Sequence, residues 1–179
     1  MKHLYRISIF ALVCASLAII LPFTAASAAQ YESLIPLLVD LSDWNADKAE
    51  GMDMTMGGTK MIQAMRMYTQ GEKELGAMIM IGNSMMTQAQ ISGMQGMQAE
   101  NNEAKFKMTT IDDFQVSLHH SKEAVEGAVV VVLASDEQQG ATFILNYKGL
   151  SEENGLALAK KFNWKKMQDL VKKKISGGN

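Results

Sequence analysis

The feature that most constrains this fold is the alternation of side chains between Met61 and Gly82. Segments 61–70 and 74–82 alternate at period two, which is typical of strands, and Gly71-Glu72 suits a two-residue hairpin turn with glycine first. If Gln70 pairs with Lys73, the two sides of the hairpin differ in composition. One side carries Met61, Met65, Met67, Met78 and Met80, and the other carries Ile62, Ala64, Tyr68, Leu75, Ala77, Ile79 and Ile81. A shift of one residue would mix these sets, so we predict this register.

Methionine is concentrated in and around this hairpin. Of the 15 methionines, 12 lie between Met52 and Met97. A thioether sulfur is either a soft metal ligand or part of a flexible, polarizable packing group. Exposed methionines would also permit a role as a sink for oxidants.

The N-terminus has the pattern of an export signal. Lys2 and Arg6 precede an apolar run over residues 7–21, and small residues around Ala28 and Ala29 suit cleavage. The alternative is an uncleaved anchor, although the run is shorter than the roughly 20 residues that span a bilayer. We predict that residues 1–29 are a signal peptide and that the mature protein is periplasmic or secreted.

The mature chain is predicted to be a soluble domain without cysteine. The single cysteine, Cys14, lies in the signal, so disulfides and thiolate chemistry are excluded from the mature chain. Removing the signal takes away two of the 17 basic residues and none of the 19 acidic ones, which leaves a charge of −4 with neutral histidines. This charge argues against nucleic acid as a partner. Because no second long apolar run follows, we expect no stable membrane insertion after cleavage.

The remaining patterns predict an α+β fold with a mainly antiparallel sheet and helices packed on one face. Residues 30–179 form one domain with a frayed C-terminal tail. The expected strands cover 52–56, 105–111, 114–120, 125–134 and 141–147, in addition to the hairpin. The expected helices run from Met85 to about Gln98 and begin after the capping residues Ser151 and Asn163.

The chain resembles a group of exported bacterial proteins of uncharacterised function. The resemblance rests on a leucine-rich segment that ends at Trp44, the Met/Gly segment 51–58, the Tyr68-x-x-Gly71 hairpin and the Phe-Asn-Trp-Lys junction at 162–165. These motifs span most of the mature chain. The resemblance implies export and an α+β fold, and it implies no active site.

A soft-metal site is the most specific chemical candidate. Met52, Met54 and Met56 would project from one side of an extended segment, and thioethers suit Cu(I) or Ag(I). Successive sulfurs on one side of a strand are about 6.6 Å apart, so a shared ion needs local bending or a donor from another strand. The alternative is that these methionines only fill apolar strand positions.

No catalytic constellation is recognisable in the sequence. His119 and His120 are adjacent, so on a strand they point to opposite faces and cannot share an ion, although either could add a nitrogen to a methionine site. The segment 82–86 lacks the last glycine of a nucleophile elbow, and there is no metalloprotease, phosphate-loop or dinucleotide motif. We therefore expect a binding or interaction protein without catalytic activity or cofactor.

The partner of such a protein is expected to be another protein or a small apolar ligand. The predicted helix after Met85 would cover the methionine side of the hairpin, and its glutamines and glycines make it weak. A groove could open between this helix and the hairpin. A periplasmic Cu(I)- or Ag(I)-binding protein is the alternative function.

Overall fold

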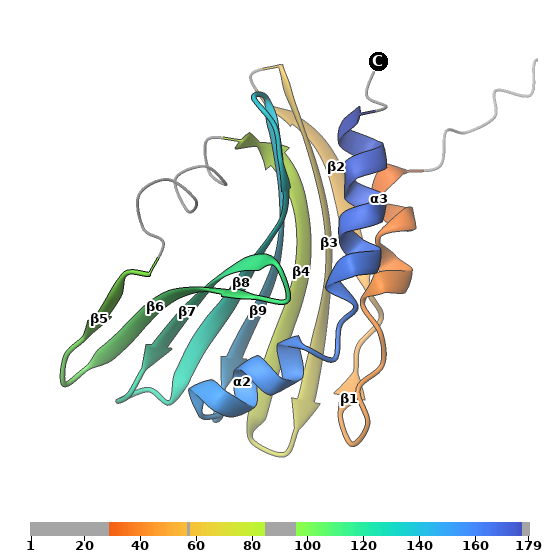
Figure 1. Ribbon diagram of the computed structural model, residues 1–179. Helices are drawn as coiled ribbons and strands as arrows, with labels where there is room; N and C mark the ends of the chain where they lie inside the picture. The colour runs from red at the N-terminus through yellow and green to blue at the C-terminus, as the bar shows by residue number, and fades with distance from the viewer. Residues whose placement is uncertain (1–28, 57, 85–95, 177–179) are drawn as a thin grey trace, which may run out of the picture.

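The computed structural model describes residues 29–56, 58–84 and 96–176 (Figure 1). The predicted signal, apart from Ala29, and residues 177–179 of the predicted tail lie outside this part of the chain. The described elements are the 3-10 helices η1 (Gln30–Ser33) and η2 (Ile35–Leu37), the strands β1 (Asn45–Ala46), β2 (Glu50–Met56), β3 (Thr59–Gln70), β4 (Lys73–Asn83), β5 (Gln98–Glu100), β6 (Ala104–Ile111), β7 (Phe114–Ser121), β8 (Glu126–Ser135) and β9 (Gln139–Lys148), and the helices α2 (Glu152–Ala159) and α3 (Trp164–Ser176). None of the described helices is long and apolar enough to cross a membrane.

The strands form one nine-stranded sheet. Its order is β1-β3-β4-β9-β8-β7-β6-β5, and β2 pairs with β3 beside β1. The pairings are antiparallel throughout. The predicted α+β class with a mainly antiparallel sheet is confirmed.

The β3–β4 hairpin has the predicted register. Gln70 pairs with Lys73, Met65 with Met78, and the turn contains Gly71 with a φ of 61°. Such a positive φ is readily adopted only by glycine. The separation of an aliphatic side from a methionine side is therefore confirmed.

The sheet has two faces of different composition. The core face bears the aliphatic side of the hairpin together with Phe114, Val116, Leu118, Val129, Val131, Phe143 and Leu145, all of which belong to one buried cluster. The opposite face, which we call the methionine face, bears Met52, Met54, Met61, Gln63, Met65, Met67, Gly76, Met78, Met80, Phe106, Met108, Ser117, His119, Ala128, Val130, Thr142, Ile144 and Asn146. Alternation along each strand produces this separation.

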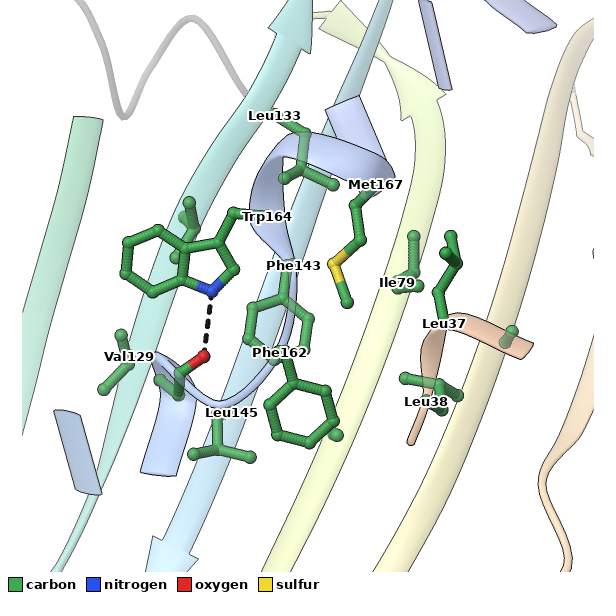
Figure 2. Close-up of a cluster of buried hydrophobic side chains, with 14 of the residues drawn as sticks. Leu37, Leu38, Ile79, Val129, Leu133, Phe143, Leu145, Phe162, Trp164 and Met167 are labelled. Atoms are coloured by element: carbon green, nitrogen blue, oxygen red, sulfur yellow. Dashed lines mark hydrogen bonds between the residues drawn. The ribbon is translucent and has the colours of Figure 1, made fainter. Parts of the chain in front are cut away.

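The helices contribute their apolar residues to the core cluster (Figure 2). Trp164 is 5% exposed, and its indole Nε1 donates a hydrogen bond to the Ala159 carbonyl at 2.9 Å. Its ring meets the Phe114 ring edge-on, with centroids 5.8 Å apart. Met167 is fully buried beside it. Burial of the indole with its N–H satisfied joins α2, α3 and β7.

The predicted caps of α2 and α3 are confirmed. The Ser151 hydroxyl accepts a hydrogen bond from the Asn154 backbone N–H, and Asn163 Oδ1 accepts one from the Lys166 N–H. These side chains satisfy backbone donors that have no partner inside the helix.

The N-terminal segment is held against β3 by polar contacts. Arg66 donates to the carbonyls of Leu38 and Asp47 and to the Asp40 carboxylate. The Tyr68 hydroxyl donates to the Val39 carbonyl at 2.9 Å, and burial raises the pKa of Tyr68 to about 12. These contacts hold the buried leucines at 34, 37 and 38 in the core.

The C-terminal end predicted for the helix that begins at Met85 is wrong. Residues 85–95 lie outside the described part of the chain, but Gly96 is in a turn with a φ of 77°, and β5 begins at Gln98. The Met97 carbonyl accepts a hydrogen bond from the Met108 N–H. Pairing with β6 therefore replaces helix at this position, a non-local contact that overrides the local pattern.

Replacing Trp164 by alanine is expected to lower the free energy of unfolding by about 3–5 kcal/mol, because it removes a buried ring and leaves a cavity. Urea denaturation followed by circular dichroism measures this change. Val39→Ala, at a side chain that is 39% exposed, is the control and should change stability by less than about 0.5 kcal/mol. Equal effects in the two variants would contradict the core described above.

Candidate functional site

Several thioethers on the methionine face are exposed. The exposed fractions are 48% for Met52, 37% for Met54, 40% for Met65 and 38% for Met67. Met108, on the same face but in β6, is only 5% exposed. Exposed apolar side chains therefore concentrate on β2 and β3, at one edge of the sheet.

A groove lies beside these methionines. A row of directly paired residues crosses five strands from β3 to β7, and its members are Met67, Gly76, Asn146, Ala128 and His119. Gly76 and Ala128, on either side of Asn146, are small and leave space between the larger Met67 and His119 at the ends of the row. The resulting groove has a volume of about 680 Å³. Its lining includes Met65, Met67, Met78, Ala128, Asn146 and His119.

Gly76 lets Met67 bend over the sheet. A Cβ at Gly76 would lie 3.2 Å from Met67 Sδ, so the thioether occupies the space that a side chain would otherwise take. Met67 therefore forms part of the wall of the groove and does not extend straight into solvent.

His119 forms the opposite side of the groove. Its ring meets the Phe106 ring edge-on, with centroids 4.5 Å apart, although the residue as a whole stays exposed. Desolvation by its neighbours lowers the pKa of His119 below the ordinary value of 6.5. The neutral imidazole is therefore the favoured form in the groove.

His120 points to the core face, as predicted for the neighbour of His119. Its Nδ1 lies 3.2 Å from the Tyr147 hydroxyl, and the two rings stack with centroids 5.9 Å apart. Burial raises the pKa of Tyr147 to about 12. The two histidines are thus on opposite sides of the sheet, and the sequence interpretation of both is confirmed.

One end of the groove carries charge. Glu74 pairs with Lys148, and Lys148 also pairs with Glu126, in a row next to Gly76, Asn146 and Ala128. The groove therefore has a polar rim at this end and an uncharged interior.

Met52, Met54 and Met56 lie in β2, which runs along β3. Met52 pairs with Gln63 and Met54 with Met61, and the side chain of Met56 is outside what the structure describes. The strand is regularly paired, so its methionines keep the spacing of an extended chain. The structure supplies Met61 as a cross-strand neighbour for Met54.

Core-side contacts fix the orientation of β2. The Asp53 carboxylate accepts hydrogen bonds from the backbone N–H groups of Gln30 and Tyr31 in η1. A Cβ on Gly51 would collide with the Tyr31 ring and the Gln63 carbonyl. Since Gly51 and Asp53 face the N-terminal segment, Met52 and Met54 face the other way. Asp53, which lies between the two methionines, therefore has a structural role, because it satisfies backbone donors at the start of η1.

Histidine does not complete a methionine site on β2. His119 is on the methionine face, but four strand spacings, about 19 Å, separate its strand from β3. The described residues contain no group of three histidine, cysteine or carboxylate side chains arranged to hold a metal ion. A metal on this face would depend on thioethers.

The groove itself was not predicted in this place. Sequence reasoning expected a groove between the hairpin and a helix, whereas the groove found spans β3 to β7. Gly76 and Ala128, which occur where the alternation assigns side chains to the methionine face, are the signal that could have indicated it.

Comparisons with known proteins give no match to a protein-family model, to a curated protein or to a solved structure. The resemblance to exported bacterial proteins therefore stays a prediction.

The lowered pKa of His119 predicts a pH dependence of stability. As the pH falls from about 8 to about 5, the unfolded chain takes up the His119 proton more readily than the folded chain, so stability decreases. His119→Gln removes this term, and its free energy of unfolding should decrease less over the same range. Urea denaturation at several pH values tests this, and identical pH dependence in both proteins would contradict it.

Proposed function

We propose that this protein is an exported, soluble binding protein without catalytic activity, and that the groove on the methionine face binds a small apolar ligand. The chain would form a single domain with its helices packed on the core face, which leaves the other face available. The observation that carries this proposal is the groove of about 680 Å³.

The size and lining of the groove support a small ligand. Ligand sites in proteins typically measure about 300–1,000 Å³ and combine apolar walls with a few polar groups. Here Met65, Met67 and Met78 provide apolar surface, and Asn146 and neutral His119 provide polar contacts. A charged ligand would gain little from this uncharged interior, whereas an apolar one would bury surface there.

Methionine suits a site of this kind. The side chain is unbranched and has several rotatable bonds, so it adapts its shape to different apolar molecules. A wall of methionines therefore favours a range of related apolar ligands over one rigid shape.

Export is supported by the sequence. Residues 1–29 have the charged start, apolar run and small residues of a signal peptide, and the remaining chain has no cysteine to oxidise. The expected location is the periplasm or the exterior.

A second candidate function is binding of Cu(I) or Ag(I) through Met52, Met54 and Met56. The pairing of Met54 with Met61 favours it, because a second strand supplies a further thioether on the same face. Along β2 alone, the first and third of these positions are about 13 Å apart, too far for their side chains to share one ion. The apolar groove is the better supported of the two.

An apolar fluorescent probe tests the groove. N-phenyl-1-naphthylamine should bind the purified chain with an increase in fluorescence. Ala128→Phe fills the groove from β8 and should weaken binding by about tenfold or more. The measurement is a fluorescence titration at fixed protein concentration.

The matched control is Ala99→Phe. Ala99 is exposed and pairs with Phe106 in β5, outside the lining of the groove. This variant adds the same ring to the sheet and should leave the affinity unchanged. No probe binding by the wild type, or the same affinity in both variants, would refute the groove as the site.

A further inference from the structure

We propose that Met65, Met67 and Met78 form a site for one soft monovalent cation, Cu(I) or Ag(I), on the β3–β4 hairpin. This site differs from the β2 methionines considered above. It does not depend on whether the groove binds an apolar ligand, because the proposal concerns the thioether sulfurs and not the apolar surface.

The register brings these three side chains together. Met65 and Met78 are directly paired, and Met67 is two residues along the same face of β3. Directly paired Cβ atoms are about 5 Å apart, neighbours along one face about 6.7 Å, and diagonal neighbours about 7–8 Å. The point equidistant from the three Cβ atoms is about 4 Å from each of them, and an ion there lies within reach of the side chains. The sulfur of methionine is two bonds beyond Cβ, so all three can reach it.

Gly76 provides the room for convergence. It is paired with Met67 and is two residues from Met78 on β4. Met67 Sδ lies over this glycine, 3.2 Å from the position of a Cβ there. The sulfur of Met67 therefore lies over β4, the strand that also contains Met78.

Met65 reaches the site by changing its rotamer. Its sulfur accepts a hydrogen bond from Gln63 Nε2 at 3.9 Å. A thioether is a weak acceptor, so this contact is easily exchanged for a metal bond. Met65 is 40% exposed, which leaves its side chain free to change rotamer.

The donor set selects the ion. Three neutral thioethers are soft ligands and suit Cu(I) and Ag(I), whereas harder divalent ions prefer nitrogen and oxygen. His119 does not supply a nitrogen, because three strand spacings, about 14 Å, separate β7 from β4. The expected complex has sulfur ligands only and one ion per chain.

The hairpin methionines are closer together than the methionines of β2. The three hairpin methionines come from two directly paired strands, whereas the three β2 methionines follow one another along a single strand. The β2 set is therefore the competing candidate site, with the same number of methionines.

The first experiment is a titration of the purified chain, labelled with [methyl-13C]methionine, with silver nitrate. The methyl signals of Met65, Met67 and Met78, assigned through single leucine variants, should shift together and saturate at one equivalent. Met167, which is fully buried, should not shift. This measurement uses the wild-type chain, so it does not depend on the folding of a variant.

The second experiment measures Cu(I) affinity by competition with bicinchoninate. Replacing Met65, Met67 and Met78 together by leucine should weaken Cu(I) binding by about tenfold or more, because leucine keeps the apolar surface but has no sulfur. The same replacement of Met52, Met54 and Met56 distinguishes the two candidate metal sites, because it weakens binding only if the β2 methionines hold the ion. Binding of N-phenyl-1-naphthylamine to the hairpin variant shows separately whether the apolar groove survives.

Two results would overturn the site. One is silver-induced shifts that are spread over all exposed methionines, or absent from the hairpin set. The other is unchanged Cu(I) affinity in the hairpin variant, including the case in which only the β2 variant loses affinity. Either would leave the proposal of an apolar groove standing, since that proposal depends on the probe titration.

Discussion

The structure depends on the antiparallel pairing of β3 with β4 in one register. Gln70 pairs with Lys73 across the Gly71 turn, and each later pair follows from this one. Because side chains alternate along a strand, this register sends every aliphatic residue of the hairpin to one face and every methionine to the other. Burial of the aliphatic face then determines which way the whole sheet is oriented, since β9 and β8 continue the same pairing.

As a result, the two faces of the sheet differ in burial and composition. The buried cluster of the core face includes leucines of the N-terminal segment and Trp164 and Met167 of α3 (Figures 1 and 2). The methionine face carries side chains of uneven size, so a groove forms where Gly76 and Ala128 lie between larger neighbours. The buried cluster and the groove therefore lie on opposite sides of the same strands.

Local patterns gave the hairpins, the helix caps and the separation of the faces, because alternation and turn chemistry act over a few residues. Local patterns do not predict the order in which distant strands pair. The groove needs Gly76 of β4, Ala128 of β8 and His119 of β7 in one row, and this depends on β9 lying between β4 and β8. Pairing of β5 with β6 likewise makes Gln98, the predicted end of a helix, a strand residue. The contact of Asp53 with η1 joins residues that are 22 positions apart, and no local pattern indicates it.

The most direct test of this account measures how fast a soluble paramagnetic agent relaxes the methyl group of each methionine. The account predicts strong relaxation for Met52, Met65 and Met67, which are exposed on one face, and little for Met108 and Met167, which are buried. Protection of Met65 and Met67 together with strong relaxation of Met167 would mean that the sheet presents its other face to solvent. That result would contradict the register and both binding proposals that rest on it.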